Sequence, residues 1–374
     1  MPDDLKIESA KDLLADSPFV TAGTLDLKTG KNGFVKLEMH EEFKERVKQM
    51  SVQNVSLWSL AGPIGIGRTW SLSWLARQAI NDNMGDNPLE TRWEAALVSG
   101  LGGSGSIRNL IELIFQTTSY LRDDAVDNLE EFSDTATDDY DRIFQYALRN
   151  EDAWSVLTGD VGRFPSIPNV SSKPRWPKRQ TQLDFLRIWL EYLNEIGVDN
   201  LLILVDEFEV LVTRLSKNKL LDLSDGLRSL YDVVESNKAS TPNVEIIMSL
   251  TPEAANRIEA GNTHELAGWI QALQDRMGPP FMFSKISYED AQIIAKECID
   301  RHRVVEVNDP FDPFTEAAVR LAYEASDGGL PRKFIKSLEQ MYTIGQNKRW
   351  IDEETAREAI KIHPDLSLNP ESIN

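Results

Sequence analysis

An apolar run, a glycine-rich loop and an amphipathic helix follow one another between residues 55 and 80, and this order constrains the fold most. Val55 to Leu60 is a short apolar run that stops at Ala61-Gly62-Pro63, as a buried strand does when it ends in a loop. From Thr69 onward, apolar residues recur at helical spacing, which predicts a helix. They are Leu72, Leu75, Ala76, Ala79 and Ile80. The sequence therefore predicts a strand, a loop and a helix in direct succession.

The loop itself reads Gly62-Pro63-Ile64-Gly65-Ile66-Gly67-Arg68-Thr69, which has the spacing of a phosphate-binding loop. Its glycines let successive N–H groups turn towards a phosphate, and the helix that follows points its positive end there. Thr69 would supply a hydroxyl to Mg²⁺. A structural glycine turn is the alternative, but the flanking strand and helix favour a phosphate site. Trp70 follows the loop and is expected near the nucleotide or in packing.

Arg68 stands where the phosphate-binding motif has lysine. Arginine keeps the positive charge, but its planar fork is larger than a compact ammonium and not interchangeable with it. We therefore expect nucleotide binding in a weakened or altered form, and slow hydrolysis.

A second apolar run, Leu201 to Val205, ends at Asp206-Glu207. Such a run is typical of a strand buried on both faces of a parallel sheet. An acidic residue at this strand end can hold Mg²⁺ through water, and its neighbour can polarise an attacking water. Taken alone, Asp206 and Glu207 could be an ordinary strand end. Together with the phosphate loop they predict an ATP and Mg²⁺ site.

These motifs resemble those of AAA+ P-loop ATPases, over about residues 40 to 362. The strand from Leu201 to Glu207 is similar to the Walker B strand of that family. Val244 to Thr251 resembles the next strand, whose polar end senses the γ-phosphate, a position held by Thr251 or Ser249. Gly328-Gly329-Leu330-Pro331-Arg332 resembles the second sensor. This form is most similar to the origin-recognition-like branch and the transposon target-selection ATPases.

The resemblance implies roles for two arginines. Arg332 would reach the γ-phosphate from a lid helix, although Gly-x-Pro-Arg is also an ordinary helix start with proline in its first turn. Arg276 lies where the resembling proteins carry an arginine that completes a neighbouring subunit's site and stabilises transition-state charge. A surface arginine near a glycine turn is the other interpretation of Arg276.

Strands alternate with helices up to about residue 284, and helices alone follow. This order predicts an α/β fold, with a parallel-sheet P-loop (AAA+) domain followed by a small α-helical lid domain. The expected divisions are a lead-in (1–37), the ATPase domain (38–284), the lid (285–364) and a tail (365–374). A long stretch at about 122–180 is interpreted as a partly helical insertion, because structureless loops of that length are uncommon inside a domain.

Charge limits the partners. The formal net charge of -20 repels nucleic acid and anionic membranes unless a local patch overrides it. One such patch is the basic loop of Lys173, Arg175, Lys178 and Arg179 around Trp176, which either contacts DNA or compensates the acidic stretch before it. The chain shows no secretion signal and no apolar run of ~18 residues. With a single cysteine, these features predict a cytoplasmic protein that does not enter a membrane.

The resulting hypothesis is an ATP-dependent switch that assembles into a homo-oligomeric ring or filament. It would be an accessory or regulatory ATPase in transposition, replication loading or anti-phage defence. The motifs end near Ile362, without room for the winged-helix domain of origin-recognition proteins, which favours an accessory role. The alternative is a catalytically weak nucleotide-binding adaptor whose acidic insertion docks a partner protein. A third option is a signalling ATPase that acts on proteins alone.

Overall fold

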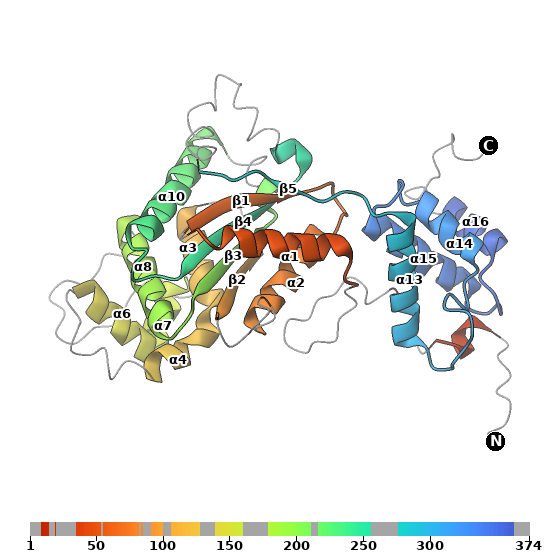
Figure 1. Cartoon of the computed structure of the whole chain (residues 1–374), viewed down its shortest axis with the longest axis horizontal. Coiled ribbons are helices and arrows are strands. Elements are labelled where there is room, and N and C mark those ends of the chain that lie inside the picture. The colour runs from red at the N-terminus through yellow and green to blue at the C-terminus, as the bar shows by residue number, and fades with distance from the viewer. Residues whose placement is uncertain are drawn as a thin grey trace. The chain divides into compact units, whose positions relative to one another are not determined.

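The computed structural model describes residues 9–14, 19, 35–53, 55–81, 84, 91–99, 106–127, 139–159, 179–210, 216–255 and 276–362. They form two compact units, a sheet unit and a lid unit (Figure 1). The sheet unit comprises the described residues of 42–61 and 72–282. The lid unit comprises those of 1–41, 62–71 and 283–374.

The sheet unit is built on five parallel strands in the order β2-β3-β4-β1-β5. The strands are β1 (Val55–Ala61), β2 (Trp93–Ser99), β3 (Asn200–Asp206), β4 (Asn243–Leu250) and β5 (Phe281–Met282). Every residue of β1 and β3 is buried, which explains why these segments are apolar without alternation. The predicted α/β parallel-sheet fold is confirmed.

The helices of this unit lie wholly or partly within its residues. They are α1 (Glu38–Met50), α2 (Arg68–Ile80), α3 (Ile107–Thr117), α4 (Arg122–Asp127), α6 (Asp139–Arg149), α7 (Glu151–Leu157), α8 (Arg179–Glu195) and α10 (Lys217–Ser236), with the 3-10 helix η2 (Ser119–Leu121). One core joins α3, α8 and α10 to Leu201, Ile203 and Val205, the alternate residues of β3 that share one face. The ring of Phe43 in α1 meets the ring of Trp58 in β1 edge to face, with centroids 5.8 Å apart. The expected insertion contains α4, α6 and α7.

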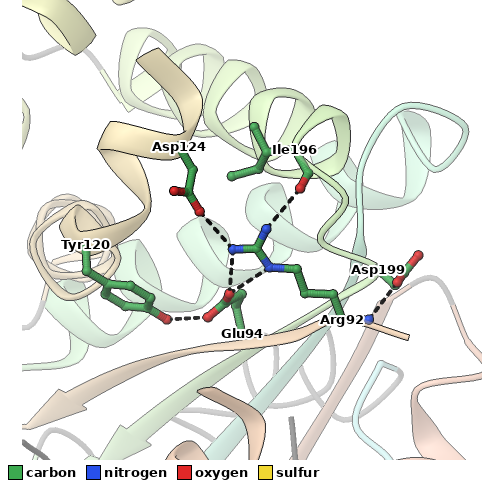
Figure 2. A network of polar contacts seen from close by, with 6 residues as sticks. All are labelled: Arg92, Glu94, Tyr120, Asp124, Ile196 and Asp199. Atoms are coloured by element: carbon green, nitrogen blue, oxygen red, sulfur yellow. Dashed lines mark hydrogen bonds and ion pairs between the residues drawn. The ribbon is translucent and has the colours of Figure 1, made fainter. Parts of the chain in front are cut away.

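A closed polar network ties the amino-terminal end of β2 to its neighbours (Figure 2). The guanidinium of Arg92 donates to the Glu94 carboxylate (3.0 Å), to Asp124 (3.1 Å) and to the carbonyl of Ile196 (3.0 Å). The Tyr120 hydroxyl donates to the second oxygen of Glu94 at 2.6 Å. Burial opposes the charge on Arg92, but the two carboxylates outweigh it and raise its pKa. The network connects the edge strand to η2, to α4 and to the turn after α8.

The lid unit has a helical core made by α13 (Tyr288–His302), α14 (Glu316–Glu324), α15 (Pro331–Gly345) and α16 (Glu353–Ile362). The 3-10 helix η1 (Ala10–Asp12) joins this core. The Ala10 amide donates to the carbonyl of Lys348 (2.7 Å), and the Val304 amide donates to that of Leu13 (2.9 Å). Part of the expected lead-in thus packs into the core of the lid unit. In the described part of the chain, no helix combines the length and apolarity needed to cross a bilayer.

Candidate nucleotide site

The glycine loop lies in the lid unit and adopts the backbone that a phosphate loop requires. Gly65 has φ +87° and Gly67 has φ +101°, in the left-handed region that side chains disfavour. A Cβ added at Gly67 would have no atom within 4 Å, so there is open space beside this residue. The Ser71 amide donates to the Gly67 carbonyl at 2.9 Å, which begins the hydrogen bonding of α2. The positive end of the α2 dipole therefore lies at the glycine loop.

The structure brings Arg332 directly against this loop. Its amide donates to the carbonyl of Gly65 at 3.1 Å, and a Cβ built on Gly65 would lie 3.3 Å from the Cβ of Arg332. The side chain of Arg332 is exposed, and among the described residues nothing forms a hydrogen bond or ion pair with its guanidinium. A free cation therefore stands beside the predicted phosphate site.

Consecutive residues of positive φ place Arg332 there. Asp327 (φ 56°), Gly328 (φ 66°) and Gly329 (φ 110°) form the turn, and Pro331 opens α15. A Cβ on Gly329 would lie only 2.2 Å from the Ile286 carbonyl oxygen, so this position requires glycine. The glycines of the Gly-Gly-x-Pro-Arg motif are thus needed by the turn itself.

A pocket opens beside the loop within the lid unit. Its cavity volume is about 30 Å³. Its walls are mostly apolar and include Val35, Leu37, Met39, Ile66, Trp70 and Ile294, together with His40. Burial lowers the pKa of His40 to about 4, so the ring is neutral near pH 7, and its Nδ1 accepts a hydrogen bond from the Leu37 amide (3.0 Å). The pocket is thus a small, mostly apolar hollow beside the glycine loop.

Sequence reasoning placed Trp70 near the nucleotide but missed the rest of this pocket. The signal is the alternation of the apolar residues Val35, Leu37 and Met39, of which the first two precede α1 and the third lies in its first turn. Those residues became recognisable as pocket walls only when packing brought them to the loop.

The carboxylates lie in the sheet unit, at the carboxyl end of β3. Asp206 is buried, with 5% of its surface exposed, while Glu207 is exposed and has φ 55°. The Ser249 hydroxyl donates to Asp206 Oδ1 at 2.7 Å and accepts from the Glu207 amide at 3.0 Å. The left-handed backbone of a non-glycine residue costs about 1 kcal/mol and is common at functional sites.

Thr251 and Ser249, the two alternatives for the end of β4, make different contacts. Thr251 Oγ1 accepts from the Ala254 amide at 3.2 Å, which caps the short helical segment that follows β4. That bond uses a lone pair and leaves the hydroxyl proton of Thr251 for another acceptor. The Ser249 proton, in contrast, is directed at Asp206.

The remaining predicted residues are placed as follows. Arg68 is buried, with 9% exposed, whereas Thr69 beside it is exposed. Arg276 donates to Asp232 (3.2 Å) and stacks over the Tyr231 ring, 5.7 Å from its centroid. In the basic loop, Lys173, Arg175 and Lys178 lie outside the described residues; Arg179 begins α8, but its side chain is not described.

The chemistry of the two predicted Mg²⁺ ligands is that of hard oxygen donors. Asp206 in the sheet unit carries a carboxylate and Thr69 in the lid unit carries a hydroxyl, and Mg²⁺ is usually held by one or two protein groups plus substrate phosphates. Within the ranges that the structure describes, no group of three or more His, Cys, Asp or Glu side chains could hold a metal.

No protein-family model and no curated protein matches the sequence. Solved structures do match. The ORC2 protein of Aeropyrum pernix in ADPNP–ADP complexes has a TM-score of 0.54 at 12% identity, covering 96% of this chain and 75% of that chain. Its ADP form gives a TM-score of 0.52 at 11% identity, covering 97% and 75%. Cdc6p of Pyrobaculum aerophilum gives 0.51 at 12% identity, covering 94% and 72%.

This chain has an origin-recognition-like AAA+ fold. At 11–12% identity, the structural likeness establishes the architecture alone. The roles of individual residues have to be argued from their geometry. The AAA+ fold accounts for the strand order, for the loop that follows β1 and for the helical unit at the carboxyl end.

Proposed function

We propose that this chain binds ATP with Mg²⁺ and acts as a slow AAA+ ATPase switch in a DNA-related process. The observation that carries the proposal is the hydrogen bond from the Arg332 amide to the Gly65 carbonyl. It joins the sensor-like turn to the phosphate-type loop beside an apolar pocket. The loop from Gly62 to Thr69 receives the phosphates. The nucleotides in the Aeropyrum complexes are consistent with this assignment.

The carboxylates perform the chemistry in this proposal. Thr69 and Asp206 hold the Mg²⁺, which neutralises charge on the phosphates when bound. Glu207 polarises the attacking water, and no described residue forms a hydrogen bond or ion pair with its carboxylate. Thr251 donates a hydrogen bond to the γ-phosphate, and Arg332 stabilises the charge that develops there.

Assembly completes the switch. Arg276 of one copy stabilises the transition state at the site of the next copy, so it must exchange its bond to Asp232 for the phosphate. ATP binding would favour the ring or filament, and hydrolysis would release it. The basic loop of Lys173, Arg175, Lys178 and Arg179 is the proposed DNA contact.

The second candidate function is a nucleotide-binding adaptor with little catalysis. The burial of Arg68 favours it, because the motif's lysine works by presenting its charge to the phosphates. In that case ATP stabilises the fold and an interface by mass action.

Steady-state ATP hydrolysis, with and without double-stranded DNA, tests these functions in the full chain and in Arg68→Lys and Glu207→Gln variants. The switch requires turnover by the native protein that Glu207→Gln lowers at least about 100-fold without loss of ATP binding. Turnover by Arg68→Lys alone would establish the adaptor instead. Absence of ATP binding by the native chain and by Arg68→Lys would overturn both functions. Retention on DNA that weakens steeply with salt would support the DNA contact.

A further inference from the structure

The Ser249 hydroxyl makes two hydrogen bonds, one as a donor and one as an acceptor. It donates to Asp206 Oδ1 at 2.7 Å and accepts from the Glu207 amide at 3.0 Å. Ser249 has 1% of its surface exposed, so water does not compete for these bonds. A single hydroxyl thus contacts both residues to which the proposed function assigns Mg²⁺ and water chemistry.

The sheet places Ser249 where this is possible. β4 lies between β3 and β1, and Ser249 pairs with Leu60, two residues before the glycine loop begins. Val205 pairs with Met248, so the next residues along the two strands are Asp206 and Ser249. The serine therefore lies between the strand end that carries the carboxylates and the strand end that leads into the loop.

The two bonds constrain different degrees of freedom. The first fixes the rotamer of Asp206 and occupies Oδ1, while the described residues offer no hydrogen bond to Oδ2. The second holds the amide of Glu207, whose left-handed backbone (φ 55°) directs an exposed carboxylate. Strained backbone of this kind persists only where surrounding contacts hold it.

We propose that Ser249 is a positioning residue that aims Asp206 at the hydrated Mg²⁺ and holds the backbone of Glu207. The proposal rests on the nucleotide function given above. Ser249 acts through these two residues and does not sense the γ-phosphate, because its hydroxyl already donates its hydrogen bond to Asp206. Removing a partner that orients a metal-binding carboxylate weakens metal affinity by about 10- to 100-fold.

The test uses the full chain and a fluorescent N-methylanthraniloyl ATP, titrated first without Mg²⁺ and then with MgCl₂. Ser249→Ala should bind this nucleotide as the native protein does without Mg²⁺, but should need about tenfold more Mg²⁺ for the same gain in affinity. Ser249→Thr, which keeps the hydroxyl, should restore the native Mg²⁺ dependence. Ser249→Cys, with its weak S–H donor, should fall between alanine and native.

The matched control is Ser56→Ala. Ser56 is a strand serine of the same sheet, 3% exposed, whose hydroxyl has no hydrogen-bond partner in the described part of the chain. Its Mg²⁺ dependence should remain native. An equal shift in the Ser56 and Ser249 variants would mean that the effect is general loosening of the sheet, and would overturn the proposal.

Hydrogen–deuterium exchange at the Glu207 amide supplies a readout that needs no nucleotide. Ser249→Ala should speed this exchange about tenfold or more, because it removes the acceptor of that amide. Native Mg²⁺ dependence with native exchange in a folded Ser249→Ala variant would refute the positioning role. If the exchange accelerates but the native chain binds no nucleotide, the proposed nucleotide function fails, and the assignment to Mg²⁺ fails with it.

Discussion

The two ends of the parallel sheet are both polar, yet their polar groups are arranged in different ways. At the amino end, Arg92, Glu94, Tyr120 and Asp124 bond to one another in a closed network (Figure 2). At the carboxyl end, Asp206 and Glu207 both bond to Ser249, and the Glu207 carboxylate is exposed. The charges at the amino end bond to one another, whereas among the described residues nothing forms a hydrogen bond or ion pair with the Glu207 carboxylate.

This difference shows how stability and function divide within one sheet. Burying charge is tolerated where every carboxylate finds a donor, as at Glu94. An unpaired carboxylate on a strained backbone brings no benefit to folding, which supports the role proposed for Glu207. Substitutions at the two ends should therefore change different observables.

The largest effect on stability is expected from Arg92→Ala. This change leaves the Glu94 side chain, 7% exposed, without its cation. We expect a loss of roughly 2 to 3 kcal/mol in the free energy of unfolding, below the usual cost of breaking a buried pair because Arg92 is 34% exposed. Chemical denaturation measures this loss. Arg357→Ala, which breaks an exposed i,i+4 pair with Glu353, should cost less than about 0.5 kcal/mol. Equal losses in the two variants would contradict the assigned role of the network.

Glu245 in β4 is an intermediate case, a buried carboxylate with a single donor. Trp58 Nε1 donates to it at 2.6 Å, and burial raises its pKa from 4.5 to about 8. Between these two pH values the folded state keeps a proton that the unfolded state has lost, so stability falls as pH rises through this window. Glu245→Gln removes the penalty, and its gain in stability should grow by about 2 kcal/mol from pH 6 to pH 8.

Thermal or chemical unfolding at the two pH values checks this prediction, with Glu195→Gln at an exposed position as the control. A gain from Glu245→Gln that is the same at pH 6 and pH 8 would show that Glu245 does not exchange its proton with folding.

At the carboxyl end, Thr251→Ala should affect stability less than Arg92→Ala does. Loss of the hydroxyl that caps the Ala254 amide should cost about 1 kcal/mol. ATP turnover should fall about tenfold if the remaining proton serves the γ-phosphate, while the Mg²⁺ dependence stays native. Paired measurements of turnover and Mg²⁺ titration on Thr251→Ala and Ser249→Ala separate the two residues. A shifted Mg²⁺ dependence in Thr251→Ala would reverse their assignments.

Local order and chemistry were readable from the residues alone. The apolar runs of β1 and β3, the loop glycines and the Asp206-Glu207 strand end predicted the α/β fold, which the structure confirms. These features are local, because a strand buried on both faces is mostly apolar and a left-handed turn favours glycine. The roles of the individual site residues remain predictions.

Tertiary structure decided which distant residues meet. Periodicity could not distinguish Ser249 from Thr251, because strand register alone places Ser249 beside Asp206. It could not show that the Arg332 amide bonds to Gly65, or that Arg276 bonds to Asp232. The sequence by itself determined the elements and the kinds of chemistry that they carry. The partners of each polar group depended on packing between segments far apart in the chain, which local propensity and spacing do not encode.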